Sequence, residues 1–404
     1  MFLLNNILGV FCAIDLFVWW RSIRNLGRTV HWGVRMAVHC FFTAQLGVVA
    51  AICWTVYRRD GTHIPASVLS VTLIWHLIVA PLTLVGNLLG MTVQAVAGFF
   101  RYPKPKPAAP SLPGSEKEGL SRRDFLGTVA TLIPPVLTFS LGSVAAKQLG
   151  KFRIRRLTLT IPNLPAALDG MTIAHLTDLH VGQLTKGRVL RKIVAEANKL
   201  EADLMLFTGD LINSDLGFLP AALETLRALR PQPVLCEGNH DVGSDRGGFE
   251  SGIQEAGFTL LLDETVSISV RGVPVQLLGI RWEGPHNLQN RHDESGLAAS
   301  MRTVLQQRDP AAFPILLAHH PHAWDYCGDI PLTLSGHTHG GQLMLNDHQG
   351  FGPWMFRYWT GLYSRPATPA HPAQTLLVNN GIGNWFPLRT AAPAEIVHLT
   401  LRRG

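Results

Sequence analysis

The hydrophobic pattern of the chain changes near residue 150. Four long apolar stretches come before it, whereas the apolar runs after it are short and alternate with polar segments. The four stretches are residues 2–20, 36–57, 61–100 and 125–146. A helix crosses a bilayer with about 20 apolar residues, so the first, second and fourth stretches each fit one crossing. The third is too long for one upright crossing and short for two, so the pattern alone leaves its number of crossings open.

The second part of the chain has the pattern of a mixed α/β domain. Short apolar runs predict strands, and runs with apolar residues three or four apart predict amphipathic helices. Expected strands cover residues 153–161, 172–176, 204–207, 234–236, 315–317, 332–334, 376–378 and 396–401. A hairpin is expected at 259–270 and 273–280, and helices are expected at 186–199, 219–229 and 297–307.

Composition sharpens this division of the 404 residues. Hydrophobic residues make up 47% and charged residues 16%, against about 25% charged residues in an average soluble domain. This balance excludes a disordered or collagen-like chain and favours membrane segments. The five cysteines form no CxxC pair, which argues against a disulfide framework and a structural zinc site. We expect about three membrane-spanning helices in 1–100, a proline-rich basic linker at 101–123, a further spanning or signal-anchor helix at 124–150 and the α/β domain at 151–404.

Net charge separates the same two parts. Residues 1–150 hold 13 Lys and Arg against 5 Asp and Glu, and residues 151–404 hold 22 against 23. The basic residues of the first part lie between apolar stretches, which is how orientation in a membrane is encoded. We therefore expect a lipid bilayer, and no nucleic acid, as the partner of this charge.

The positions of the basic residues predict which side of the membrane each connection occupies. The arginines of 21–35 and the basic linker 101–123 are expected in the cytoplasm, which requires one crossing by 61–100 and leaves 151–404 outside. Residues 121–126 read SRRDFL and resemble the twin-arginine export signal, so the twin-arginine export machinery is an expected partner. The basic run 147–156 argues for the opposite side, because positive residues favour the cytoplasm.

Five polar clusters follow predicted strands of the second part. They read TDLH (177–180), GD (209–210), GNHD (238–241), AHHP (318–321) and GHTHGG (336–341). Ligands of α/β sheets bind beyond the carboxyl ends of strands, so five strands are expected to direct carboxylate, amide and imidazole groups to one place. An isolated Asp after a strand is usually a turn residue, but five such clusters in one order are not expected by chance.

The chemistry of these clusters predicts a metal centre. They offer oxygen and imidazole donors without a thiolate, a set that suits divalent Mn, Fe or Zn. The groups are too many for one tetrahedral ion and enough for two, and two neighbouring ions need a bridging ligand such as a carboxylate. In D-x-H and H-x-H, an extended backbone puts both residues on one side, so both can reach the same metal centre.

The same motifs in the same order, D-x-H, GD, GNHD, a later His and GHTH, resemble the calcineurin-like metallophosphoesterases. The resemblance covers nearly all of 151–404. The stretches LSGHTHGGQ (334–342), YWTGLY (358–363) and GIGNWFPLR (381–389) are similar to a bacterial, membrane-attached and often exported subgroup. The resemblance implies a four-layer αββα sandwich, which periodicity alone does not. With the predicted topology, we expect a multi-pass protein of the bacterial cytoplasmic membrane whose catalytic domain lies on the outer, periplasmic or extracellular face.

The resemblance also implies a role for each polar residue. The metal ligands fall into two sets that share one carboxylate: Asp178, His180 and His339 for one ion, Asn239, His319 and His337 for the other, and Asp210 as the bridge. Two catalytic residues bind no metal: His240 would sit over the substrate phosphate, and Asp241 would orient it. No residue of the family pattern is missing from this chain.

The implied activity is that of a metal-dependent phosphoric ester hydrolase. Two divalent ions lower the pKa of a bridging water, so that hydroxide attacks the phosphate near neutral pH. The expected substrate is a phosphodiester or a phosphomonoester, and the membrane anchor favours a lipid-linked one. Two alternatives stay open. One is a nucleotide-lipid pyrophosphatase of the UDP-diacylglucosamine type, which needs a cytoplasmic site. The other is a non-catalytic metal-binding scaffold, against which the intact His240 argues.

The aromatic segment 350–365 has two interpretations. It contains Phe351, Trp354, Phe356, Tyr358, Trp359 and Tyr363, together with Arg357 and Arg365. These side chains could contact a membrane interface or a lipid headgroup near the anchor. Alternatively they pack the loop around the site, which the similarity of YWTGLY to the family favours.

Overall fold

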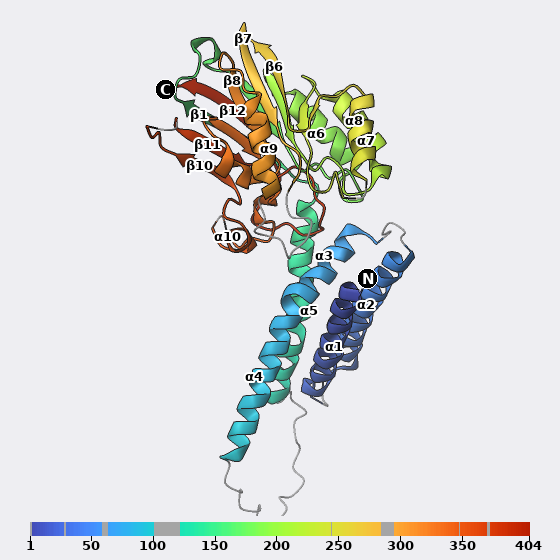
Figure 1. Cartoon of the computed structure of the whole chain (residues 1–404). Coiled ribbons are helices and arrows are strands. Elements are labelled where there is room, and N and C mark those ends of the chain that lie inside the picture. Colours follow the sequence, from blue (N-terminus) through green and yellow to red (C-terminus); the bar gives the residue numbers. More distant parts are fainter. Residues whose placement is uncertain are drawn as a thin grey trace, which may run out of the picture. The chain divides into compact units, whose positions relative to one another are not determined.

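The chain folds into two compact units, Met1–Ala146 and Lys147–Gly404, which are described separately (Figure 1). The computed structural model describes residues 2–27, 30–58, 64–100, 122–243, 245–283, 295–346, 348–369 and 372–404. The expected linker up to residue 121, including the Ser121 that opens the SRRDFL sequence, lies outside the described residues.

The first unit is built from long helices. They are α1 (Phe2–Asn25), α2 (Trp32–Arg58), α3 (Ala66–Ile74), α4 (Ala80–Phe99) and α5 (Arg122–Gln148). Four segments are long and apolar enough to cross a membrane: Asn6–Asn25, Trp32–Thr55, Ala66–Phe99 and Asp124–Gln148. The stretch whose number of crossings the sequence leaves open is one uninterrupted run of 34 residues, in which a π-helical turn, η1 (Trp75–Val79), joins α3 to α4.

A buried polar cluster ties α1 to this π-helical turn. Asp15 of α1 accepts a hydrogen bond from the indole Nε1 of Trp75 at 2.6 Å, and its other oxygen lies 3.0 Å from Nε2 of His76. The second ring nitrogen of His76 is bonded to the carbonyl of Thr72 at 2.8 Å. Polar groups inside a membrane segment are costly unless they pair, so this cluster holds α1 against η1.

We expect Asp15→Ala to destabilise the first unit. The substitution leaves the side chains of Trp75 and His76 without their hydrogen-bond partner, which costs about 1–3 kcal/mol for each unsatisfied buried group. Asp15→Asn is the matched control, because an amide can accept from Trp75 and donate to His76. Thermal unfolding of the full chain in detergent should shift down by several degrees for the alanine variant and little for the asparagine variant. Equal unfolding temperatures for wild type and Asp15→Ala would contradict this role.

The second unit contains two six-stranded mixed sheets. The first has the order β1 (Arg153–Ile161), β12 (Glu395–Arg403), β2 (Thr172–Leu176), β3 (Leu204–Thr208), β4 (Val234–Cys236) and β5 (Leu260–Leu261). The second has the order β10 (Gly361–Arg365), β11 (Gln374–Val378), β9 (Leu332–Ser335), β8 (Phe313–Leu317), β7 (Val273–Gly279) and β6 (Glu264–Val270). Strands β2 to β5 run parallel, as do β7, β8, β9 and β11, so the carboxyl ends within each set lie at one edge.

The layers follow from the alternation of side chains along the strands. In β3, Leu206 belongs to the core between the two sheets, whereas its neighbour Phe207 packs under the helices that cover the first sheet. Those helices are α6 (Arg188–Asn198), α7 (Leu219–Ala228) and α8 (Arg246–Glu255). Helix α9 (Ser295–Gln306) covers the second sheet. The four-layer αββα sandwich implied by the resemblance is therefore the observed fold (Figure 1).

Most expected strands of this unit match observed strands, but the expected strand 259–270 is wrong as a single element. It consists of β5 in the first sheet and β6 in the second. Asp263 separates them with a φ of 60°, and its carboxylate accepts a hydrogen bond from the backbone N–H of Arg281 at 2.9 Å. Helix α8 was not expected, because its sequence RGGFESGIQE is rich in glycine, which weakens a helical pattern.

Candidate metal centre

The polar clusters of both sheets meet in the second unit. Residues 178 and 180 follow β2, residue 210 follows β3, residue 239 follows β4, residue 319 follows β8, and residues 337 and 339 follow β9. Five of these residues have a positive φ: Asp178 (53°), His180 (45°), Asp210 (56°), His337 (71°) and His339 (50°). This conformation is costly for residues other than glycine and collects at functional sites.

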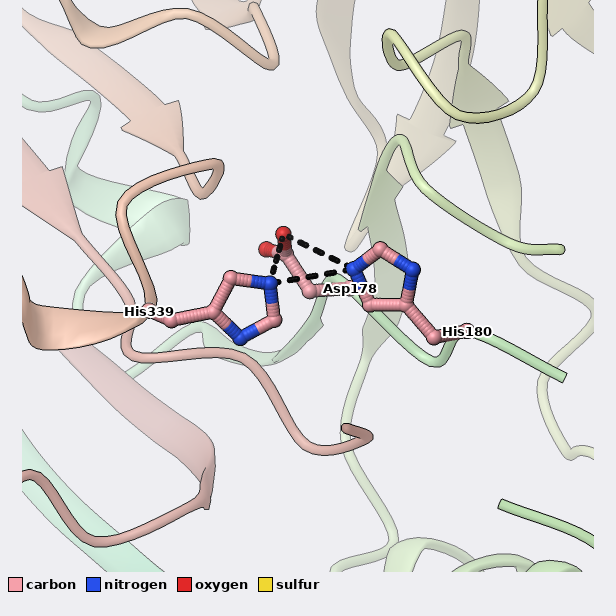
Figure 2. Close-up of side chains that lie close together, drawn as sticks. All are labelled: Asp178, His180 and His339. Atoms are coloured by element: carbon pink, nitrogen blue, oxygen red, sulfur yellow. Dashed lines mark hydrogen bonds and ion pairs between the residues drawn. The ribbon is translucent and has the colours of Figure 1, made fainter. Parts of the chain in front are cut away.

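One predicted ligand set is assembled around Asp178 (Figure 2). Nε2 of His339 lies 3.1 Å from Oδ1 of Asp178 and 3.0 Å from Nε2 of His180. The same Nε2 of His180 lies 3.8 Å from Oδ1 of Asp178. All three residues are buried, and apart from these two imidazoles Oδ1 of Asp178 has no hydrogen-bond partner among the described residues. The three candidate ligand atoms, Oδ1 of Asp178 and Nε2 of each histidine, therefore lie close enough together to bind one ion.

The second predicted set gathers around Asn239. Its Oδ1 lies 2.9 Å from Nδ1 of His337 and 3.2 Å from Nε2 of His319. Nδ1 of His319 is bonded to the carbonyl of Thr208 at 2.7 Å. Because a carbonyl only accepts, the ring proton is on Nδ1, and Nε2 of the neutral ring is free to bind an ion.

Asp210 lies between the two sets. Its Oδ2 is 3.4 Å from Nε2 of His180 in the first set and 3.2 Å from Nε2 of His319 in the second. Its Oδ1 accepts a hydrogen bond from the backbone N–H of His240 at 2.8 Å. One carboxylate oxygen therefore faces donors of both sets, as a bridging ligand must.

These separations fit metal coordination. Two neighbouring atoms bound to one ion at about 2.0–2.1 Å lie about 2.8–3.4 Å apart. Apart from the 3.8 Å between Asp178 and His180, every separation given above between two predicted ligand atoms falls in that range. His and Asp groups close enough to hold an ion occur at Asp178, His180 and His339, at Asp178, Asp210 and His319, and at His180, Asp210 and His240. The geometry agrees with a metal site of this donor set, and Mn, Fe or Zn stays the prediction for its occupants.

The pKa shifts at the site keep most of the predicted ligands in the deprotonated form that binds metal. Burial lowers the pKa of His180 and of His339, and it lowers the pKa of His337 to about 3, so these imidazoles are neutral. Burial alone would raise the pKa of Asp210, but the neighbouring His319 and His180 hold it below its ordinary value. The carboxylate in turn outweighs the burial of His319 and raises its pKa to about 9. A metal ion therefore competes with a proton for His319, so the affinity of the site for metal decreases as the pH is lowered.

His240 lies beside the predicted ligand sets, but among the described residues no hydrogen bond joins its ring to Asp241. The ring of His240 stands 4.6 Å from that of His180 between centroids. Its Nδ1 is 2.9 Å from Oγ of Ser214. The carboxylate of Asp241 accepts from the backbone N–H groups of Ile212 at 3.0 Å and Gly238 at 2.9 Å. Asp241 thus fixes the loop that carries His240, and Ser214, which no sequence motif marks, makes the direct contact.

Arg389 is a further residue that sequence reasoning missed, although it closes the quoted stretch GIGNWFPLR. Its side chain is fully buried, and burial lowers its pKa to about 10. All five of its donors have acceptors: the carbonyls of Asn380, Gly383 and Ala392, Oδ1 of Asn384, and Nδ1 of His339 at 3.0 Å. A guanidinium only donates, so the neutral His339 ring carries its proton on Nε2 until an ion displaces it. Arg389 therefore holds the ring of His339, a predicted metal ligand, in place.

Comparisons with known proteins agree with this site. The family described as calcineurin-like phosphoesterase matches residues 171–341. The uncharacterized metallophosphoesterase YkuE of Bacillus subtilis (strain 168) is 30% identical over 297 residues, which are 70% of this chain and 98% of that protein. A transmembrane protein with metallophosphoesterase domain from Danio rerio is 28% identical over 299 residues, 72% of this chain and 66% of that protein, so the match spans just under two thirds of that relative.

A further relative is named for its substrate. The UDP-2,3-diacylglucosamine pyrophosphatase LpxG of Chlamydia trachomatis is 27% identical over 318 residues, covering 67% of this chain and 93% of that protein. The relatives come from bacteria and from a vertebrate. The resemblance to one bacterial subgroup therefore stays a prediction.

The position of Asp210 predicts that Asp210→Ala removes both ions, because the one carboxylate serves both ligand sets. Elemental analysis of the purified full chain should find far less than two ions per chain for this variant. Asp215→Ala is the matched control: that carboxylate is exposed and caps the turn at Gly217, so its removal should leave the metal content unchanged. Two tightly held ions in Asp210→Ala would exclude a bridging role.

Proposed function

Because the chain belongs to the calcineurin-like metallophosphoesterases, we propose that it is a membrane-anchored hydrolase of phosphodiesters or phosphomonoesters that works with two divalent metal ions. The position of Asp210 carries the proposal: its Oδ2 lies 3.4 Å from Nε2 of His180 and 3.2 Å from Nε2 of His319. A carboxylate shared in this way suits two ions near enough to act on a single phosphate. The bilayer beside the anchor makes a lipid-linked phosphoester a fitting substrate.

The protein's own groups complete the chemistry. Two divalent ions held by these ligands would supply Lewis acidity toward phosphate oxygens and hydroxide near neutral pH. Ser214 fixes the ring of His240 through Nδ1 at 2.9 Å, which leaves Nε2 to donate a proton to the leaving oxygen or to stabilise charge on the phosphate. Burial lowers the pKa of His240, against the pull of Asp210, and a lowered pKa makes the protonated ring a stronger acid.

A second candidate is a nucleotide-lipid pyrophosphatase that faces the cytoplasm. The similarity to LpxG, 27% identity over 93% of that protein, favours it. A non-catalytic scaffold is disfavoured because His240, to which the family resemblance gives a catalytic role, is present and its ring lies 4.6 Å from that of His180 between centroids. The two enzymatic candidates differ in the side of the membrane on which the site must lie.

We place the catalytic unit on the outer face of a bacterial cytoplasmic membrane. The basic connection 101–123 supports this orientation, as does the SRRDFL sequence, whose Arg122 is the first residue of α5. The twin-arginine machinery carries folded domains, which suits a site assembled from loops of two sheets. The basic run 147–156 opposes it, but long domains cross membranes largely regardless of charge.

The role of His240 predicts that His240→Asn keeps the metal ions and loses activity. The rate on a chromogenic phosphodiester with added Mn should fall by about 10²–10⁴, the usual contribution of one general acid or base. Metal content should stay at the wild-type level. His348→Asn is the control, since that exposed histidine should change neither quantity.

Loss of metal from His240→Asn would make His240 a ligand and overturn its assigned role. Ser214→Ala adds a finer test. It removes only the contact to Nδ1 of His240, so it should lower the rate less than His240→Asn does and leave the metal content unchanged.

Sidedness is tested with reporters fused after Gly404. A β-lactamase that folds without a disulfide should protect the cells there and a reporter that needs the cytoplasm should be silent, because we expect an external C-terminus. Replacing Arg122 and Arg123 by Lys should abolish the external signal. An internal C-terminus that both replacements leave unchanged would refute export and favour the nucleotide-lipid pyrophosphatase.

A further inference from the structure

Exposed apolar side chains gather on two loops of the second unit. Seven large apolar side chains are exposed among the described residues of 147–404, and five of them lie on the segments 345–355 and 384–390. We call these five the apolar rim: Leu345 (83% exposed), Phe351 (51%), Trp354 (76%), Met355 (36%) and Trp385 (42%). Exposed apolar clusters of this kind mark binding surfaces rather than ordinary protein surface.

The two loops of the apolar rim form one surface. The side-chain amide of Gln342 donates to the carbonyl of Leu388 at 2.7 Å. The backbone N–H of Met344 donates to Oγ1 of Thr390 at 2.8 Å, and the backbone N–H of Thr390 donates to the carbonyl of Gln342 at 3.0 Å. These bonds fix the loop that carries α10 (Phe351–Met355) to the loop that carries Trp385.

The apolar rim borders the metal centre. The ring of Trp385 lies 5.7 Å from that of His240 and 6.5 Å from that of His339 between centroids. On the other loop, the ring of Phe356, next to α10, lies 5.9 Å from that of His337. Any surface that the rim touches is therefore close to the phosphate site.

The first residues of this unit, at Leu149, contact the loop that carries Trp385. Nδ2 of Asn384 donates to the carbonyl of Leu149 at 2.9 Å, and Oδ1 of Asn384 accepts from Nε of Arg389 at 3.1 Å. Arg389 then bonds Nδ1 of the ligand His339 at 3.0 Å. Leu149 directly follows α5, whose segment Asp124–Gln148 is long and apolar enough to cross a membrane. Two side chains thus connect the residue that follows the span to a metal ligand.

Basic residues beside the rim match a membrane interface. Lys147 and Lys151 are exposed on either side of Leu149. The guanidinium of Arg357 lies over the ring of Tyr358 beyond α10, where it is 68% exposed and pairs with Asp325 at 3.3 Å. Aromatic side chains together with Lys and Arg are typical of the headgroup level of a bilayer. The basic run 147–156, whose charge opposes export, has the side chains that suit contact with lipid phosphates.

We infer that the apolar rim inserts into the interface of the bilayer that anchors the chain, and that the metal centre thereby acts on phosphoesters whose apolar part stays in the membrane. The second statement rests on the proposed function, and the first does not. Both interpretations of the aromatic segment 350–365, packing around the site and contact with a membrane, apply to different residues. Tyr358 is 5% exposed and packs inside, whereas Phe351 and Trp354 are exposed at the rim.

Photo-crosslinking tests the surface without requiring activity. The full chain carrying Trp354→p-benzoylphenylalanine is reconstituted into vesicles of tritiated phosphatidylcholine and illuminated. We expect a lipid adduct on the chain. Leu362→p-benzoylphenylalanine is the matched control, since Leu362 is 41% exposed on β10, outside the rim, and should give little adduct. A crosslink between two copies of the chain, or equal adducts at both positions, would overturn the inference.

A matched pair of substrates tests the substrate class. Methyl p-nitrophenyl phosphate is soluble, and hexadecyl p-nitrophenyl phosphate resides in vesicles; in both, a bond from phosphorus to the oxygen of water forms as the bond to nitrophenolate breaks. The full chain should prefer the hexadecyl ester in kcat/KM. Phe351→Ser combined with Trp354→Ser should reduce that preference about tenfold and leave the methyl ester rate unchanged, while Leu362→Ser should change neither.

The outcomes separate the two proposals. An unchanged preference in the Phe351→Ser/Trp354→Ser variant would contradict the rim as a route for lipid substrates, even if both esters are cleaved. Cleavage of neither ester by the metal-loaded wild type would contradict the proposed function instead, and the crosslinking result would still decide whether the rim contacts lipid.

Discussion

Asp210 is buried with Oδ2 3.4 Å from Nε2 of His180 and 3.2 Å from Nε2 of His319, on loops that come from different sheets. A buried carboxylate is costly unless charged or hydrogen-bonded partners surround it. Here Asp178 is buried as well, so two negative charges share a small volume. Their stability depends on the histidines around them and, in the proposed enzyme, on two cations. The meeting of the two sheets at their carboxyl ends is what makes this arrangement possible.

The backbone around these carboxylates leaves no room for other side chains. A Cβ on Gly336 would lie 2.3 Å from Oδ2 of Asp178, and a Cβ on Gly238 would lie 2.3 Å from Oδ1 of Asp210. Both contacts are too close for any residue with a side chain. Asp178 and Asp210 also have positive φ angles. The backbone here therefore adopts a costly conformation that positions the two carboxylates. The sheets supply the packing energy that holds this conformation.

Sequence reasoning could predict the strands, the order of the polar clusters and, through the family resemblance, the ligand sets, because period-2 apolar runs and D-x-H spacing are local features. It could not predict that β5 belongs to the first sheet while the hairpin of β6 and β7 belongs to the second, because this division depends on the turn at Asp263. It also missed Ser214 and Arg389, which reach His240 and His339 across 26 and 50 residues of sequence. Such contacts exist only once the sheets have packed. The same packing decides which aromatic residues of segment 350–365 are buried and which are exposed.

We propose that one carboxylate, that of Asp210, joins two metal ions in this fold. Electron paramagnetic resonance of the full chain loaded with Mn²⁺ tests it directly, because ions that share a bridging ligand are exchange-coupled and isolated ions are not. We expect the spectrum of a coupled pair in the wild type, with two ions bound per chain. A spectrum of magnetically isolated Mn²⁺ at that same metal content would contradict it.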